Sequence, residues 1–178
     1  AAVTVGRPGY PVDGVQVYVF SMDGSYRGIV GTTSGGGRVD FRLPVGAYKF
    51  RADYQGSQYW STDTELSADQ TNRVEIATGG ETFFFTVMKG AVEPLAGVRC
   101  FVFSDAGAYL GLSGTTDGNG LVGFDLADGS YKIRVDYLGT QFWTEDIRVP
   151  ALMSAAKQIT HRTLTVTVAG QLMGDSLP

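Results

Sequence analysis

The sequence has one cysteine, Cys100, and one histidine, His161, among its 178 residues. A single thiol excludes an internal disulfide. A single imidazole excludes a multi-histidine metal site, and His161 has no recognisable partners for a catalytic triad. The many Ser and Asp residues stand in no known nucleophile motif. We therefore expect no enzymatic activity, with Cys100 as a small buried apolar side chain and His161 as a solvent-facing linker residue.

Charged side chains are also scarce, at 18% of the chain, and the formal net charge is −4. Nucleic acid is not expected as a partner, because neutralising phosphates requires clustered Lys and Arg. No apolar run approaches the roughly 20 residues of a membrane-spanning helix. No charged-then-apolar signal segment opens the chain, so we expect the sequence to begin as a mature protein or as a fragment of a longer one.

What the sequence does contain is an internal repeat. Residues 14–60 align with residues 97–143 at a constant offset of 83, without a gap, and 25 of the 47 positions are identical. The 25 glycines and the abundant Val, Thr, Tyr and Phe favour strands separated by turns. The stretch "TLTVTVAGQLMGDSLP" parallels the opening of both copies. We therefore predict repeats at 1–80 and 81–162, followed by the opening strand and loop of a third at 163–178.

Apolar and polar residues alternate strictly along the copies. In "RVDFRL" the apolar residues are Val39, Phe41 and Leu43, and "SYKIRVDY" alternates in the same way. Alternation of period two predicts half-buried antiparallel strands. In the first copy they lie near residues 2–5, 14–20, 26–32, 38–43, 46–54, 57–62 and 72–77. The segment "LMSAAKQ" is expected to form at most one helical turn. Seven short strands with Gly-rich turns predict an all-β fold of two tandem Greek-key sandwiches.

The strand patterns "GVQVYVF…GTTSGGGRVDFRLPVGAYKFRADY" and "GVRCFVF…GTTDGNGLVGFDLADGSYKIRVDY" resemble the carboxypeptidase-regulatory-like and collagen-adhesin B-type repeats of bacterial surface proteins. The resemblance covers about 45 residues of each copy. It implies immunoglobulin-like or prealbumin-like sandwiches without enzymatic activity. Collagen-adhesin relatives often carry a Lys–Asn isopeptide bond, usually from the first strand. "AAVTV" has no Lys, and Lys49 and Lys132 are predicted to point outward, so we expect no such bond.

An octet with paired aromatic residues occurs in both copies, as "DYQGSQYW" and "DYLGTQFW". In a regular strand Trp60 shares a face with Gln58, and Tyr59 faces the other way. Three interpretations remain open: core packing, a contact between modules or subunits, and a sugar-binding platform. The residues concerned are Gln58, Tyr59, Trp60, Gln141, Phe142 and Trp143.

No cofactor is expected. The turn "DGNG" offers Asp117 and Asn119 as calcium ligands, but a calcium loop needs further spaced oxygen ligands and a closing Glu. The first copy has no carboxylate at the equivalent residues 34–37, which argues against calcium at this turn.

The sequence thus predicts a non-catalytic structural repeat of an extracellular or cell-surface bacterial protein, such as a stalk, an adhesin array or a filament subunit. Its expected partners are other copies or neighbouring repeats, joined head-to-tail or by strand addition. The candidate assembly strand comprises Thr163, Leu164, Thr165, Val166, Thr167 and Val168. The alternative is a carbohydrate-binding module that uses the two aromatic pairs to bind a glycan.

Overall fold

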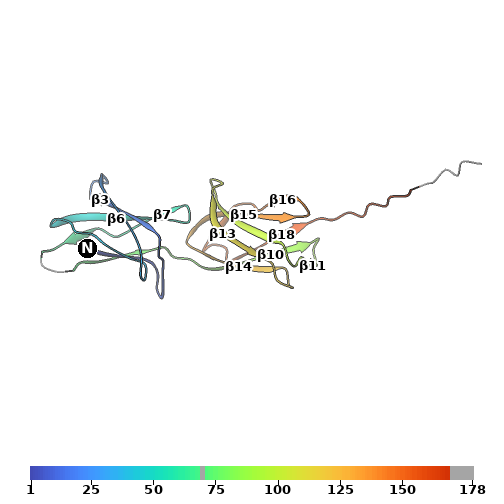
Figure 1. Ribbon diagram of the computed structural model, residues 1–178, viewed down its shortest axis with the longest axis horizontal. Coiled ribbons are helices and arrows are strands. Elements are labelled where there is room, and N and C mark those ends of the chain that lie inside the picture. The colour runs from blue at the N-terminus through green and yellow to red at the C-terminus, as the bar shows by residue number, and fades with distance from the viewer. Residues whose placement is uncertain (69–70, 169–178) are drawn as a thin grey trace, which may run out of the picture.

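The computed structural model describes residues 1–68 and 71–168, and the regular elements in that part of the chain are eighteen β-strands. The strands form four sheets around two hydrophobic cores, one between Val3 and Ile76 and the other between Phe83 and Ile159. Figure 1 shows the resulting two sandwiches in line along the long axis of the molecule. The fold is therefore all-β, with a first sandwich built from β1 to β9 and a second from β10 to β18.

In the first sandwich, one sheet has β1 at its centre, and the other has the order β4-β3-β6-β7 with β8 beside the beginning of β6. Strand β1 pairs antiparallel with β5 and β2 and parallel with β9. The strands are β1 (Ala2–Arg7), β2 (Tyr10–Pro11), β3 (Gln16–Ser21), β4 (Tyr26–Thr32), β5 (Arg38–Asp40), β6 (Gly46–Tyr54), β7 (Ser57–Trp60), β8 (Thr64–Leu66) and β9 (Arg73–Ala77).

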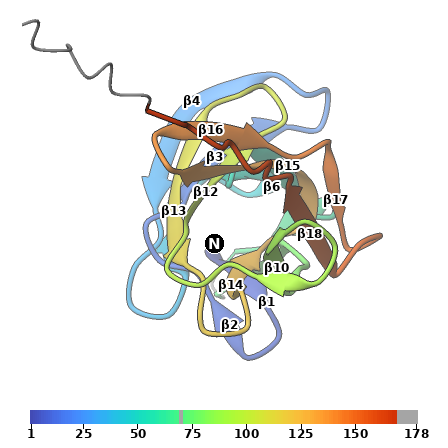
Figure 2. The same ribbon diagram turned by 90° about the vertical axis from the view of Figure 1, so that its right-hand side faces the viewer.

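The second sandwich repeats this topology, with β10 central in one sheet and the order β13-β12-β15-β16 in the other. Its strands are β10 (Glu81–Lys89), β11 (Glu93–Pro94), β12 (Arg99–Ser104), β13 (Tyr109–Thr115), β14 (Leu121–Leu126), β15 (Gly129–Tyr137), β16 (Thr140–Trp143), β17 (Ile147–Val149) and β18 (Ser154–Ile159). In a view along the molecule, equivalent strands such as β3 and β12, or β6 and β15, lie nearly behind one another (Figure 2).

The alternation of the sequence determines which side chains form the cores. Val15, Val17 and Val19 are buried in the first sandwich, and Val98, Cys100 and Val102 are buried at the equivalent places in the second. Phe41 and Phe124, and Tyr48 and Tyr131, are likewise buried in both. These apolar rows exclude water between the sheets, which is the main favourable term in the folding of such a domain.

Three details differ from the sequence-based prediction. Strands β9 and β18 run parallel to β1 and β10, whereas antiparallel pairing was expected throughout. Ser154–Ile159 is a strand rather than a helical turn, because its backbone pairs with β10. Residues 163–168 form no strand, since a strand needs a partner for its N–H and C=O groups. The predicted loop at 169–178 lies outside the described residues.

Candidate functional site

The β6–β7 hairpin of the first sandwich points at the second sandwich. Its turn has two residues, Gln55 with φ of 47° and Gly56 with φ of 78°. Positive φ at both residues is the backbone conformation of a type I′ hairpin turn. A Cβ on Gly56 would lie 3.0 Å from Cβ of Ser104 in the second sandwich. The turn is therefore both sharply bent and in close contact with its neighbour.

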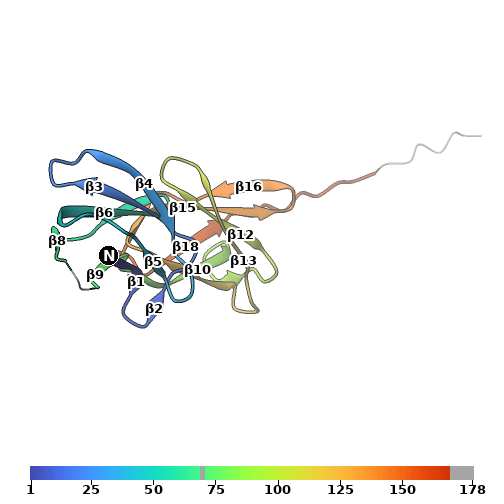
Figure 3. The same cartoon turned by 60° about the vertical axis from the view of Figure 1, so that its left-hand side comes forward.

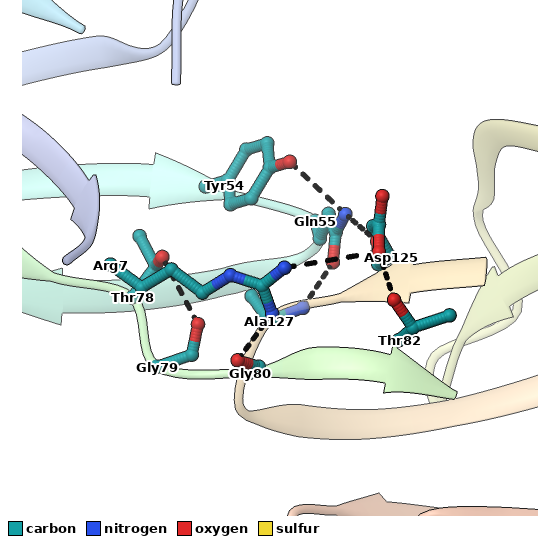
Figure 4. Close-up of polar contacts among 9 residues, drawn as sticks. All are labelled: Arg7, Tyr54, Gln55, Thr78, Gly79, Gly80, Thr82, Asp125 and Ala127. Atoms are coloured by element: carbon teal, nitrogen blue, oxygen red, sulfur yellow. Dashed lines mark hydrogen bonds and ion pairs between the residues drawn. The ribbon is translucent and has the colours of Figure 1, made fainter. Parts of the chain in front are cut away.

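The Gln55 side chain links the two sandwiches (Figure 4). Its Oε1 accepts hydrogen bonds from the backbone N–H of Ala127 at 2.8 Å and from the Tyr131 hydroxyl at 3.1 Å. Its Nε2 donates to the carbonyl of Asp125 at 3.0 Å. One amide thus satisfies three polar groups in and beside the turn between β14 and β15, and a hydrogen bond of this kind contributes about 1 kcal/mol.

Tyr59 forms a second polar link at the same place. Its hydroxyl donates to the backbone carbonyl of Asp128, and its ring packs against the first core. Burial raises the pKa of Tyr59 above its ordinary value. Of the aromatic pair Tyr59 and Trp60, the structure therefore places Tyr59 at the junction of the sandwiches.

The linker between β9 and β10 is held by backbone bonds. The N–H of Thr78 donates to the carbonyl of Gly6, and the N–H of Asp128 donates to the carbonyl of Thr78, each at 3.0 Å. Gly79 and Gly80 have φ of 61° and 87°, and a Cβ on either would come within about 2 Å of Asp128 Oδ2 or of the Leu126 carbonyl oxygen. A side chain is therefore disfavoured by backbone conformation at both positions, and at Gly80 it is also excluded by the backbone of Leu126 and Ala127.

Arg7 completes the junction from the other sheet. Its guanidinium donates to the carbonyl of Gly80 and lies 3.9 Å from the carboxylate of Asp125. The Asp125 side chain is 77% exposed, so the ion pair contributes little, about 0–1 kcal/mol. The same carboxylate accepts a hydrogen bond from Thr82. Figure 4 shows these groups converging from both sandwiches.

The tryptophans of the two octets lie on the outer face of each sandwich. Trp60 packs against Phe20, with ring centroids 4.9 Å apart, and Arg51 lies over the ring of Tyr18 while it pairs with Asp53 at 2.8 Å. The second sandwich repeats this cluster with Phe101, Phe103, Arg134, Asp136 and Trp143. Gln58 and Gln141 are exposed on the same strands as the two Trp residues, and Phe142 packs against the second core.

The candidate assembly strand extends away from the second sandwich (Figure 3). Leu164, Val166 and Val168 are 84%, 74% and 89% exposed. His161, just before this segment, is exposed and lies edge-on to the ring of Tyr137 with centroids 5.5 Å apart. Three apolar side chains on one side of an extended segment form a surface that this sandwich does not cover.

The turn proposed for calcium uses its carboxylate on its own backbone. Asp117 Oδ1 accepts from the N–H groups of Asn119 and Leu121 at 2.8 and 2.9 Å. In the first sandwich Asp13 does the same for Gly36 and Gly37 from a neighbouring loop. Among the described residues, no three His, Cys, Asp or Glu side chains lie together as metal ligands would.

Cys100 is fully buried, and burial raises its pKa from 9.0 to about 12. Because the folded pKa exceeds the unfolded one, burial of the thiol stabilises the fold below pH 9, and this contribution is lost between pH 9 and pH 12. The free energy of unfolding should fall as the pH rises from 8 to 10.5. We expect this fall to be about 1–2 kcal/mol smaller in Cys100→Val, which copies Val17 of the first sandwich. Urea unfolding at both pH values measures this, and equal losses in the two proteins would contradict it.

The junction residues Gln55, Asp125 and Ala127 were not singled out from the sequence. Neither hydrogen-bonding capacity nor position in a turn distinguishes them from other surface residues. The adjacent pair Gly79-Gly80, at the predicted boundary between repeats, was the available signal, because paired glycines mark a backbone that needs positive φ or close approach.

No helix among the described residues has the length and apolarity needed to span a membrane. No protein-family model and no curated protein matches the sequence.

Several solved structures are similar at low identity. The minor pilin of the gram-positive pathogen Streptococcus agalactiae is 14% identical, with a TM-score of 0.46 over 96% of this chain and 99% of that one. The Bacillus anthracis TIE protein is 13% identical (TM-score 0.39; 90% of this chain, 33% of that one). A putative cell adhesion protein from Bacteroides ovatus is 10% identical (TM-score 0.36; 90% and 92%). The chain thus spans about a third of the TIE protein, and it spans 62% of a streptococcal ancillary pilin.

Proposed function

We propose that the chain is a non-catalytic structural segment of a secreted or cell-surface bacterial protein, in which sandwiches joined end to end form a stiff rod. The observation that carries this proposal is the junction between the sandwiches. Gln55, Tyr59 and the backbone of Thr78 all bond across it, and the two-glycine linker is closely enclosed. Such a junction resists bending, as a stalk or filament requires.

We further propose that residues 1–80 and 81–162 are two structural repeats and that residues 163–178 begin a third. In the register of the repeats, Val166 and Val168 correspond to Val3 and Val5, which are fully buried in the central strand β1. The same side chains are exposed in the tail. A sandwich of a neighbouring copy that takes up this strand would bury them, and contacts of that kind extend head-to-tail into open filaments.

Deletion of residues 163–178 tests this assembly role. We expect the full chain to form assemblies in negative-stain electron microscopy and sedimentation, and the truncated chain to lose them. Val166→Asp with Val168→Asp should have the same effect, because both charges fall on the apolar side of the strand. Thr165→Asp with Thr167→Asp adds equal charge to the other side and is the matched control. Unchanged assembly after truncation would refute the role of the tail.

One observation favours glycan binding as a second candidate function. Trp60 and Trp143 remain 44% and 39% exposed beside exposed Gln58 and Gln141, and exposed aromatic rings with nearby amides can stack on sugars and bond to them. Titration with soluble glucans, chitin fragments and xylan, followed by tryptophan fluorescence, distinguishes the two functions. A structural segment should show no saturable change. Trp60 and Trp143 are the only tryptophans of the chain, so the double variant Trp60→Ala with Trp143→Ala is followed by isothermal titration calorimetry instead. A saturable fluorescence shift in the unchanged protein, with calorimetric binding that the double variant loses, would establish the second candidate.

A further inference from the structure

The second sandwich carries a hairpin tip that is equivalent to the one in the junction but has no partner among the residues that the structure describes. Leu138 takes the place of Gln55, with φ of 48°, and Phe142 takes the place of Tyr59. Leu138 is 80% exposed, and a Cβ on the adjacent Gly139 would meet nothing within 4 Å. The side-chain amide and the hydroxyl that bond across the internal junction are both replaced by apolar groups.

The opposite end of the molecule carries the complementary surface. The turn Leu43–Gly46, just before β6, is equivalent to the turn Leu126–Gly129 that receives Gln55. In it, Pro44 replaces Ala127 and Val45 replaces Asp128; both are exposed, Val45 by 67%. Figure 1 shows the beginning of β6 and the β15–β16 hairpin at opposite ends of the molecule.

The substitutions on the two free surfaces match one another. At the internal junction, Gln55 accepts from the backbone N–H of Ala127. Pro44 has no N–H to donate, and Leu138 has no acceptor that would require one. The turns themselves are alike, since the hydroxyl of Tyr48 lies 3.2 Å from the Pro44 carbonyl oxygen and the hydroxyl of Tyr131 lies 2.9 Å from the Ala127 carbonyl oxygen. The apolar tip at Leu138 thus matches the apolar turn at Pro44, and that turn has the same shape as the turn that receives Gln55.

The path of the chain leaving the second sandwich favours a separate molecule as the occupant. In the register of β18 with β10, Thr160 and His161 stand where Gly79 and Gly80 form the internal linker. At the place of Gly80, a Cβ would collide with the backbone of a turn docked as closely as Leu126 and Ala127 are, and at the place of Gly79 it would meet the side chain that stands at Asp128. Thr160 and His161 therefore cannot follow the close path of Gly79 and Gly80 without displacing that turn, so a sandwich docked tightly on this tip is expected to be a separate molecule rather than a directly linked third sandwich.

We propose that the hairpin tip at Leu138 and Phe142 of one copy docks on the turn at Pro44 and Val45 of a second copy, forming an apolar version of the internal junction. This deepens the proposed function and rests on it, because it names the surfaces by which structural segments join. The contact uses different surfaces on the two copies, so it extends into a line of molecules rather than closing a dimer.

Sedimentation velocity of the full chain over a wide concentration range tests the proposal. We expect reversible self-association that Leu138→Gln weakens about tenfold or more, because the amide would be buried against a proline with no N–H. Pro44→Ala in the same chain, which supplies that N–H, should restore most of the loss. Leu152→Gln, at an exposed leucine in the loop before β18, is the matched control and should change nothing.

Two outcomes would overturn the proposal: a monomer at every concentration, or association that Leu138→Gln leaves unchanged. The chain lacking residues 163–178 separates this proposal from the assembly role of the tail. If that truncated chain still associates and Leu138→Gln still weakens it, the tip-to-turn contact stands without the tail. If truncation abolishes association while Leu138→Gln has no effect, the contact is wrong and the tail remains the connector.

Discussion

Replacement of Phe83 by alanine is expected to lower the free energy of unfolding of the second sandwich by about 3–5 kcal/mol. Phe83 is fully buried in β10, the central strand of its sheet. Removing its ring leaves a cavity in the core between the two sheets of the second sandwich, which rigid sheets cannot close. Urea unfolding followed by fluorescence measures the loss, and a Trp60→Phe background leaves Trp143 to report on the second sandwich alone.

The neighbouring residue Phe84 is the matched control for Phe83. It has the same side chain one position along the strand, but it faces outward and is 48% exposed. Phe84→Ala should cost less than about 1 kcal/mol, since much of its ring already contacts water. Comparable losses for the two variants would mean that the inward and outward faces of β10 are wrongly assigned.

Replacement of Gly80 by alanine is expected to disturb the junction as well as the fold. At φ of 87° an L-residue is strained by about 1–2 kcal/mol. In addition, the new Cβ would lie 2.0 Å from the carbonyl oxygen of Leu126, a backbone atom that cannot rotate away. Either the pairing of Glu81 with Leu126 at the beginning of β10 is lost, or the turn that receives Gln55 shifts and the first sandwich moves relative to the second. Small-angle X-ray scattering and urea unfolding detect the two consequences.

Gly90→Ala separates backbone strain from the clash. Gly90 has φ of 61°, and a Cβ there would meet nothing within 4 Å. It should therefore cost only the strain of a left-handed backbone and leave the scattering profile unchanged. If Gly80→Ala costs no more than Gly90→Ala and leaves the molecule equally extended, the close approach of the linker to Leu126 is not a constraint on the junction.

The strands and cores could be predicted from the sequence because their signal is local. Alternation along "RVDFRL" or "SYKIRVDY" assigns each side chain to a face, whatever the partner strand is. The same local signal says nothing about strand direction, and for that reason the parallel pairing of β9 with β1 was not predicted. It also predicted a strand at residues 163–168, whose alternation is that of a strand although they have no partner strand here.

The sequence by itself determined the repeat, the alternating faces and the buried rows such as Val15, Val17 and Val19, because these depend on spacing along one chain. It also placed Gln55 and Tyr59 in a recurrent octet, but without a role for either. Only the tertiary structure decided that Tyr59 joins the sandwiches while Trp60 faces outward, and that Gln55 bonds to Ala127. Those contacts span about 70 residues, and a hydrogen bond at that separation depends on how two folded units are positioned. No pattern within either unit contains that information.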